Sequence, residues 1–135
     1  MTLLTWNDSR NVGVQAMDDQ HGILMDTMNE LRLALLRGSG HEQINENLKR
    51  LIEYTRMHFQ SEEQLLEQQG FPGLLSHRAA HQQLLLQMRE TADRAERHED
   101  KEIHSLLYFL GGWYFEHIEE HDRQYGPWLN ARGVY

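Results

Sequence analysis

Two pairs of potential metal ligands, separated by a turn, constrain the fold of this chain more than any other sequence feature. His58 and Glu62 are four residues apart, as are His77 and His81, and the stretch 70–73 between the pairs reads Gly-Phe-Pro-Gly. On an α-helix, residues four apart are separated by about 40° around the axis, so each pair faces one way. Because glycine and proline favour a tight turn, the stretch predicts a helical hairpin with potential ligands in one interface.

The apolar residues predict an all-α fold, an up-down-up-down antiparallel four-helix bundle with an N-terminal loop arm. Leucines and methionines recur at spacings of three and four in successive stretches, which is typical of amphipathic helices. We expect helices at about 18–37, 41–69, 73–97 and 101–125, after an arm at 1–17. Trp6 is expected to anchor the arm, Asp18 to cap the first helix, and Gly126-Pro127 to end the fourth. Short links favour antiparallel neighbours.

Composition narrows the possible functions. The chain has 135 residues and a net charge of -8, and no cluster of lysine or arginine stands out, which disfavours binding to nucleic acid. It has no cysteine, so disulfides and thiolate metal sites are excluded. The sequence shows neither a signal peptide nor a transmembrane segment. We therefore expect a single domain over residues 1–135, cytoplasmic and monomeric, that binds no membrane.

Polar side chains in the bundle seam are the second unusual feature, in a chain with nine histidines. The inward-facing residues of this kind are His21, His58, Glu62, His77, His81 and His117. Burying an unpaired carboxylate costs several kcal/mol, and an unpaired imidazole roughly 1–3 kcal/mol. One buried histidine is usually a core residue with satisfied hydrogen bonds. So many at one level of a bundle predict a metal ion that neutralises them.

With these residues in hand, the chain resembles the hemerythrin family, in particular its single-domain bacterial members. The matching segments are Asp18-Asp19-Gln20-His21, His58-Phe59-x-x-Glu62-Glu63, His77-x-x-x-His81 and His117-Ile118-x-x-x-Asp122. The resemblance covers nearly the whole chain, and the combined motifs are far more specific than any single pair. It implies a hemerythrin-like domain with a metal centre inside the bundle.

The resemblance implies a centre of two non-haem iron ions bridged by an oxide or hydroxide. It assigns His77, His81 and His117 to one iron, His21 and His58 to the other, and Glu62 and Asp122 as bridges between the two. Two octahedral ions offer about twelve positions, and these side chains with the bridging oxygen fill all but about one. The open position falls on the iron with fewer histidines. A single zinc ion would need only about four ligands.

The choice of Asp122 as a ligand rests on the resemblance and not on helix geometry. His117 and His121 are four residues apart and share a helix face, so geometry alone favours His121. Residues five apart on an ideal helix diverge by about 140°, which would turn Asp122 away from His117. We therefore predict a π-type widening of the helix between His117 and Asp122.

The resemblance further implies reversible O₂ binding at the open position, for storage, delivery or sensing. Leu24 and Ile118 match pocket positions in the family, and Trp113 lies one turn before His117, so we expect these three residues to line the O₂ pocket. Their alternative role is ordinary bundle core. A histidine-rich ligand set favours reversible binding, so we expect no enzyme beyond a weak peroxidase-type side activity. The alternatives are a di-iron peroxidase or nitric oxide scavenging enzyme, and a zinc-binding interaction module.

Overall fold

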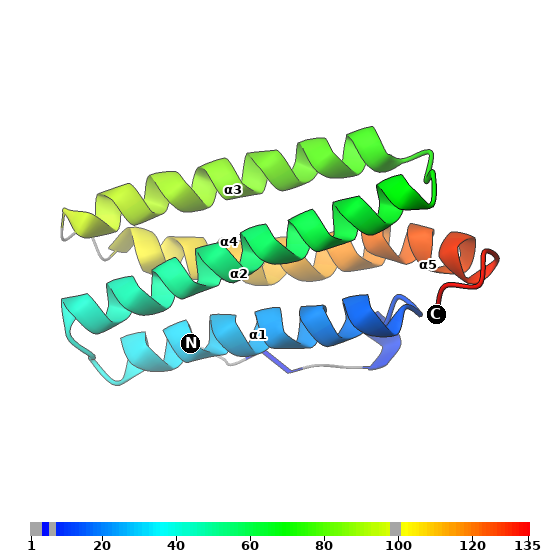
Figure 1. Ribbon diagram of the computed structural model, residues 1–135. Coiled ribbons are helices and arrows are strands. Elements are labelled where there is room, and N and C mark those ends of the chain that lie inside the picture. The colour runs from blue at the N-terminus through cyan, green and yellow to red at the C-terminus, as the bar shows by residue number, and fades with distance from the viewer. Residues whose placement is uncertain (1–3, 6–7, 98–100) are drawn as a thin grey trace.

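In the computed structural model, four long helices lie side by side as an antiparallel bundle, which confirms the predicted fold class (Figure 1). The structure describes residues 4–5, 8–97 and 101–135, without the side chains of residues 95 and 102, so Trp6 lies outside the described residues. The long helices are α1 (Gln15–Leu36), α2 (His41–Gln68), α3 (Leu74–Glu96) and α4 (Lys101–His117). A 3₁₀ turn, η1 (Asp8–Arg10), precedes α1, while a π-helix, η2 (Ile118–Asp122), and helix α5 (Arg123–Asn130) extend α4.

Glycines in the left-handed conformation reverse the chain after the first two long helices. Gly38 follows α1 with a φ of 64°, and Gly70 follows α2 with a φ of 70°, values that residues with a side chain rarely adopt. Beyond Gly70, the backbone N–H of Phe71 donates to the carbonyl of Leu66 at 2.9 Å. This bond satisfies a carbonyl that the end of the helix would otherwise leave free. The turn therefore places α2 and α3 as the predicted hairpin.

The start of α1 differs from the prediction, because Asp18 does not cap this helix. α1 begins at Gln15, and Val14, in an extended conformation, occupies the cap position. The Asp18 carboxylate instead accepts hydrogen bonds from the backbone N–H groups of Val12 at 2.7 Å and Gly13 at 3.3 Å. Asp18 therefore ties the arm to the first turn of α1, and the helix begins three residues before it, at Gln15.

The predicted end of the last helix at Gly126-Pro127 is also wrong. α5 continues to Asn130 with Pro127 inside it. Proline removes one backbone donor from a helix, but Tyr125 and Leu129 on either side of it are fully buried. The burial of these two side chains outweighs the missing hydrogen bond, because a fully buried large apolar side chain contributes roughly 1.5–3 kcal/mol.

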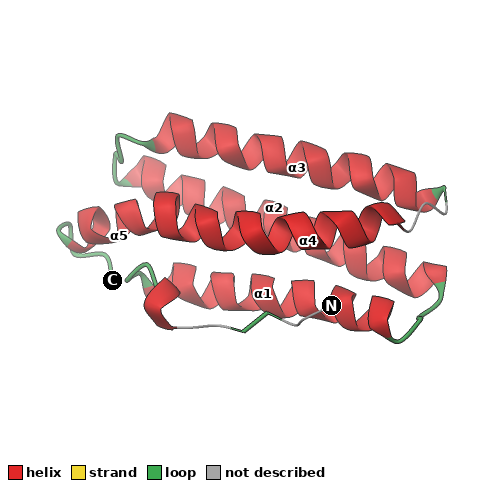
Figure 2. Cartoon of the chain, turned by 180° about the vertical axis from the view of Figure 1, so that it is seen from behind, coloured by secondary structure: helices red, strands yellow, loops and turns green. Residues whose placement is uncertain are grey.

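The N-terminal arm and the C-terminal segment meet at the end of the bundle where α1 begins (Figure 2). A Cβ atom added to Gly126 would lie 1.8 Å from the carbonyl oxygen of Val12, so only glycine allows the arm to approach α5 this closely. Asn130 donates from Nδ2 to the carbonyls of Gly13 at 3.0 Å and Val134 at 2.7 Å. These contacts attach the arm and the C-terminal segment to the same end of the bundle.

An apolar core fills the opposite half of the bundle. Its most deeply buried side chains are Leu31, Leu48, Leu51, Met88, Ile103 and Leu107. All of these positions except Leu107 belong to the predicted apolar stripes, and their burial supplies the main stabilisation of the bundle. Among the described residues, no helix is long and apolar enough to cross a membrane.

Candidate metal centre

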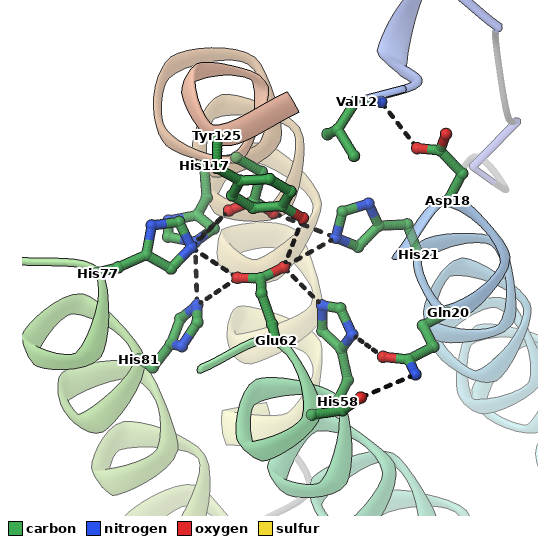
Figure 3. A network of polar contacts seen from close by, with 12 residues as sticks. Val12, Asp18, Gln20, His21, His58, Glu62, His77, His81, His117 and Tyr125 are labelled. Carbon is green, nitrogen blue, oxygen red and sulfur yellow. Dashed lines mark hydrogen bonds and ion pairs between the residues drawn. The ribbon is translucent and has the colours of Figure 1, made fainter. Parts of the chain in front are cut away.

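Buried polar side chains converge at the end of the bundle near the arm (Figure 3). Because neighbouring helices are antiparallel, the beginnings of α1 and α3 lie at the same end as the later parts of α2 and α4. The residues brought together are His21 from α1, His58 and Glu62 from α2, His77 and His81 from α3, His117 from α4 and Asp122 from η2. The structure therefore brings together the seven residues that the resemblance assigns as metal ligands.

Asp122 reaches this cluster because the backbone widens, as predicted. Residues 118–122 form a π-helix, in which residue i bonds to residue i+5 and the two approach the same face. Asp122 Oδ1 lies 3.0 Å from His117 Nε2. Asp122 is 1% exposed, whereas His121 is exposed. The structure thus turns the carboxylate inward and the His121 ring outward.

Three histidines form one side of the cluster, here called the three-histidine group: His77, His81 and His117. His77 Nε2 lies 2.6 Å from Glu62 Oε1 and 2.8 Å from Asp122 Oδ1. His81 Nε2 lies 3.3 Å from Glu62 Oε1 and 3.2 Å from His117 Nε2. All three rings therefore direct Nε2 toward the same carboxylate oxygens.

The other side, the two-histidine group, consists of His21 and His58 and faces the remaining carboxylate oxygens. His21 Nε2 lies 3.5 Å from Glu62 Oε2 and 3.1 Å from Asp122 Oδ2. His58 Nε2 lies 3.5 Å from Glu62 Oε2. The Tyr125 hydroxyl donates to the same Glu62 oxygen at 2.9 Å. Each carboxylate consequently presents one oxygen to each histidine group.

This donor set fits a pair of metal ions better than it fits a hydrogen-bond network. His77 Nε2 carries at most one hydrogen, yet it contacts oxygens of both carboxylates. Ligand atoms at right angles around an ion, each at about 2.1 Å, lie about 3.0 Å apart. The ligand atoms gather in two sets that share Glu62, and within each set all lie within 4.8 Å of one another. Imidazole nitrogens and carboxylate oxygens suit first-row transition metals.

The electrostatics of the cluster also favour positive charge between the groups. Burial favours the neutral ring of His77, but contact with Asp122 and Glu62 outweighs it and raises the pKa of His77 to about 10. The same opposition raises the pKa of His21 to about 9. Burial prevails at His58 and lowers its pKa to about 4. Burial would raise the pKa of Glu62, yet hydrogen bonds from the surrounding histidines hold it well below its usual value.

A second set of side chains holds the ligand rings, and the sequence reasoning assigned these residues no role. His58 Nδ1 lies 2.6 Å from Gln20 Oε1, and Gln20 Nε2 donates to Ser61 Oγ at 3.2 Å. Gln20 directly precedes His21 in the sequence. Gln20 also stands in a segment that carries the resemblance, but its role could not be predicted because the contact joins two helices.

The three-histidine group is held by a charged residue and by aromatic rings. His81 Nδ1 lies 3.0 Å from Glu63 Oε2, and Arg78 Nε donates to the other Glu63 oxygen at 2.9 Å. The Phe59 ring stacks on His81 with centroids 3.7 Å apart and an interplanar angle of 2°. These contacts fix the tautomer and the plane of the ring, so the Nε2 lone pair points into the cluster.

A small apolar cavity of about 20 Å³ lies beside the cluster. Its lining residues are Leu24, Met28, Leu51, Thr55, Phe59, Leu84, Met88, Leu110, Trp113 and Tyr114. Leu24 and Trp113 were expected at an O₂ pocket, and Trp113 also stacks on His117 with centroids 4.5 Å apart. Ile118 is fully buried but does not line this cavity, so its expected pocket position is not found here. The volume is close to that of one small molecule.

The fold and the cluster together define a metal-binding four-helix bundle with a histidine-rich centre. Residues 12–129 match the family described as "Hemerythrin HHE cation binding domain". The chain belongs to the hemerythrin family.

Individual relatives agree with this assignment. The chain is 34% identical to a bacteriohemerythrin of Methylococcus capsulatus, covering 97% of this chain and 100% of the relative. It is 31% identical to a bacteriohemerythrin of Stenotrophomonas maltophilia, covering 97% of this chain and 84% of the relative. Its structure is similar to a crystal structure of a hemerythrin mutant, with a TM-score of 0.84 at 30% identity over 94% of this chain and 97% of that chain.

Proposed function

We propose that this protein binds O₂ reversibly at two non-haem iron ions held between the histidine groups. His77, His81 and His117 would hold one ion, and His21 and His58 the other. Glu62 and Asp122 would bridge the two ions. Two ferrous ions so held would supply the electrons needed to bind O₂ and recover them on its release.

The division of the carboxylate oxygens carries this proposal. Glu62 directs Oε1 toward the three-histidine group and Oε2 toward the two-histidine group. Asp122 directs Oδ1 toward His77 and Oδ2 toward His21 in the same way. A single ion would be bound by both oxygens of one carboxylate, or by one oxygen from each carboxylate, all directed toward the same histidine group. Two acids that each face both ways are what a bridged pair of ions requires.

The side chains around the centre favour a reversible process by limiting access to protons. Thr55 and Tyr114 are the hydroxyl-bearing residues that line the cavity. The Thr55 hydroxyl donates to the carbonyl of Leu51 at 2.7 Å, and the Tyr114 hydroxyl donates to the carbonyl of His21. Both hydroxyl hydrogens are therefore directed to backbone oxygens and not into the cavity. A dry cavity without available protons slows the irreversible oxidation of the metal.

The size of the cavity favours a diatomic ligand over a larger substrate. Its volume of about 20 Å³ is sufficient for one small molecule. This observation supports a binding protein more than a peroxidase that must also admit an organic reductant. Nitric oxide is of similar size, so the experiment below must separate its consumption from reversible O₂ binding.

An absorption spectrum tests the proposal. The iron-loaded protein is reduced without air, and its spectrum is recorded before O₂ is added, after it is added, and after it is removed. We expect a visible charge-transfer band that appears with O₂ and disappears when O₂ is removed, and no band from a zinc-loaded control. A permanent spectral change, or turnover of peroxide or nitric oxide without a reversible band, would contradict reversible O₂ binding.

A further inference from the structure

The two histidine groups differ in the side chain that accepts a hydrogen bond from a ligand ring. On the two-histidine side, the acceptor for His58 Nδ1 is Oε1 of Gln20, a neutral amide, at 2.6 Å. On the three-histidine side, the acceptor for His81 Nδ1 is Oε2 of Glu63, a carboxylate, at 3.0 Å. Both contacts are made by Nδ1 of a ligand ring, and the acceptors differ in charge.

Each acceptor is itself held in place. Gln20 Nε2 donates to Ser61 Oγ at 3.2 Å, which leaves the amide oxygen directed at the His58 ring. Arg78 donates to Glu63 at 2.9 Å, which keeps this carboxylate ionised and oriented toward His81. Glu63 is partly buried, with 17% of its side chain exposed, so the ion pair is only partly screened by water.

The charge of the acceptor changes how strongly the opposite ring nitrogen binds a metal. A ring that donates Nδ1–H to a carboxylate gains electron density at Nε2, whereas a neutral amide oxygen withdraws that hydrogen less strongly. His81 is therefore a stronger donor than His58 even before the number of histidines on each side is considered. Outer contacts of this kind typically change metal affinity by about 10–100-fold.

We propose that Gln20 and Glu63 are positioning residues that make the two metal positions unequal, so that ions fill the three-histidine position first and leave the two-histidine position first. This inference rests on the two-ion site proposed above. It assigns the weaker binding, and hence the exchangeable ion, to the side of His21 and His58. The side chains of Gln20 and Glu63 have the same shape and differ only in ending in an amide or a carboxylate. The structure shows that Gln20 contacts His58 and Glu63 contacts His81.

Titration of the metal-free protein with Zn²⁺ tests the order of filling without any O₂ chemistry. Calorimetry gives the stoichiometry and the two affinities, and long-range ¹H–¹⁵N NMR of the imidazole rings identifies the histidines that bind at each step. With one Zn²⁺ per chain, we expect the rings of His77, His81 and His117 to shift while those of His21 and His58 keep their metal-free resonances.

Two isosteric variants test the role of the acceptors. Gln20→Glu should raise the affinity of the second Zn²⁺ about tenfold, and Glu63→Gln should lower the affinity of the first about tenfold. Both variants should therefore bring the two affinities closer together. Gln64→Glu adds the same charge to an exposed position of α2 and serves as the matched control. It should leave both steps unchanged, and circular dichroism checks that each variant keeps its helices.

Two results would overturn the inference while leaving the proposed function intact: all five rings shifting together in the parent protein, or Gln20→Glu behaving like Gln64→Glu. Binding of a single Zn²⁺ at saturation would have a different meaning. It would overturn the two-ion site, and with it both the proposed function and this inference.

Discussion

The two sides of the metal centre share the same carboxylates but are built differently. The three-histidine group is stacked on aromatic rings, with Phe59 against His81 and Trp113 against His117, and its outer contact is the anionic Glu63. In the two-histidine group the rings of His21 and His58 meet in a T-shaped arrangement, with centroids 4.8 Å apart and an interplanar angle of 74°. The difference teaches that two groups sharing the same carboxylates can hold their rings by different contacts, aromatic stacking and an anion on one side and a neutral amide on the other.

The largest effect should come from removing Glu62, a carboxylate that contacts both histidine groups. Glu62 is fully buried and contacts both groups, so Glu62→Ala should weaken the binding of both ions by about 100-fold. Calorimetric titration with Zn²⁺ measures this change. Glu46→Ala, at an exposed position of the same helix, is the control and should bind both ions normally. Loss of only one ion in Glu62→Ala would show that the acid serves one side alone.

A change where α5 contacts the arm should affect His21 more than the three-histidine group. In Gly126→Ala the new Cβ would meet the carbonyl oxygen of Val12 at 1.8 Å, and the backbone must move. Overpacking of this kind costs roughly 1–3 kcal/mol in the free energy of unfolding, measured by denaturant titration. Because Asp18 ties the arm to the turn before His21, the His21 ring resonance should shift more than that of His81.

Gly112→Ala is the matched control for this substitution. Gly112 lies on α4 with no atom within 4 Å of an added Cβ, so alanine there should stabilise the protein by about 0.5–1 kcal/mol. Equal stability of the two variants would mean that the close approach of Val12 to Gly126 does not constrain the fold.

A polar residue in the cavity should accelerate the irreversible oxidation of the ferrous protein in air. Leu24 lines the cavity, so Leu24→Ser should speed autoxidation in air by roughly tenfold, because it admits water and a proton donor beside the two-histidine group. Ile118 is buried outside this cavity, and Ile118→Ser should have a smaller effect on the rate. The decay of the reduced, O₂-exposed protein is followed by absorption. Equal rates for both variants and the parent would count against the cavity as the O₂ pocket.

The last expected effect is a dependence of stability on pH. In the metal-free protein, the pKa of His77 is raised from 6.5 to about 10 and that of His21 to about 9. A group whose pKa is raised on folding contributes its full stabilisation of the folded state at a pH below its pKa in the unfolded chain. This contribution is lost as the pH rises through its pKa in the folded protein. The metal-free protein should therefore lose stability between about pH 6.5 and pH 10.

Metal loading should flatten this part of the pH profile, because bound ions replace the protons on the rings. Thermal unfolding of both forms across the same pH range measures the difference. An identical fall in melting temperature for the metal-loaded and the metal-free protein would show that these histidines do not face the metal.

Local patterns in the sequence determined much of this protein. The spacing of leucines and methionines indicated the long helices, the glycines after α1 and α2 marked the reversals, and inward-facing histidines indicated a metal centre. These features depend on helix periodicity and on glycine conformation, which a chain expresses over a few residues. The resemblance to hemerythrins then singled out Asp122, which periodicity alone would have turned away from His117.

Only the tertiary structure decided how these residues act together. It divided the oxygens of Glu62 between the histidine groups, placed Gln20 against His58 and Glu63 against His81, and drew Asp18 from a helix cap to an anchor of the arm. Each of these outcomes depends on a contact between residues that lie apart in the sequence. Such contacts are determined by packing across the bundle, where the distances between elements, and not the spacing within one helix, decide which contact forms.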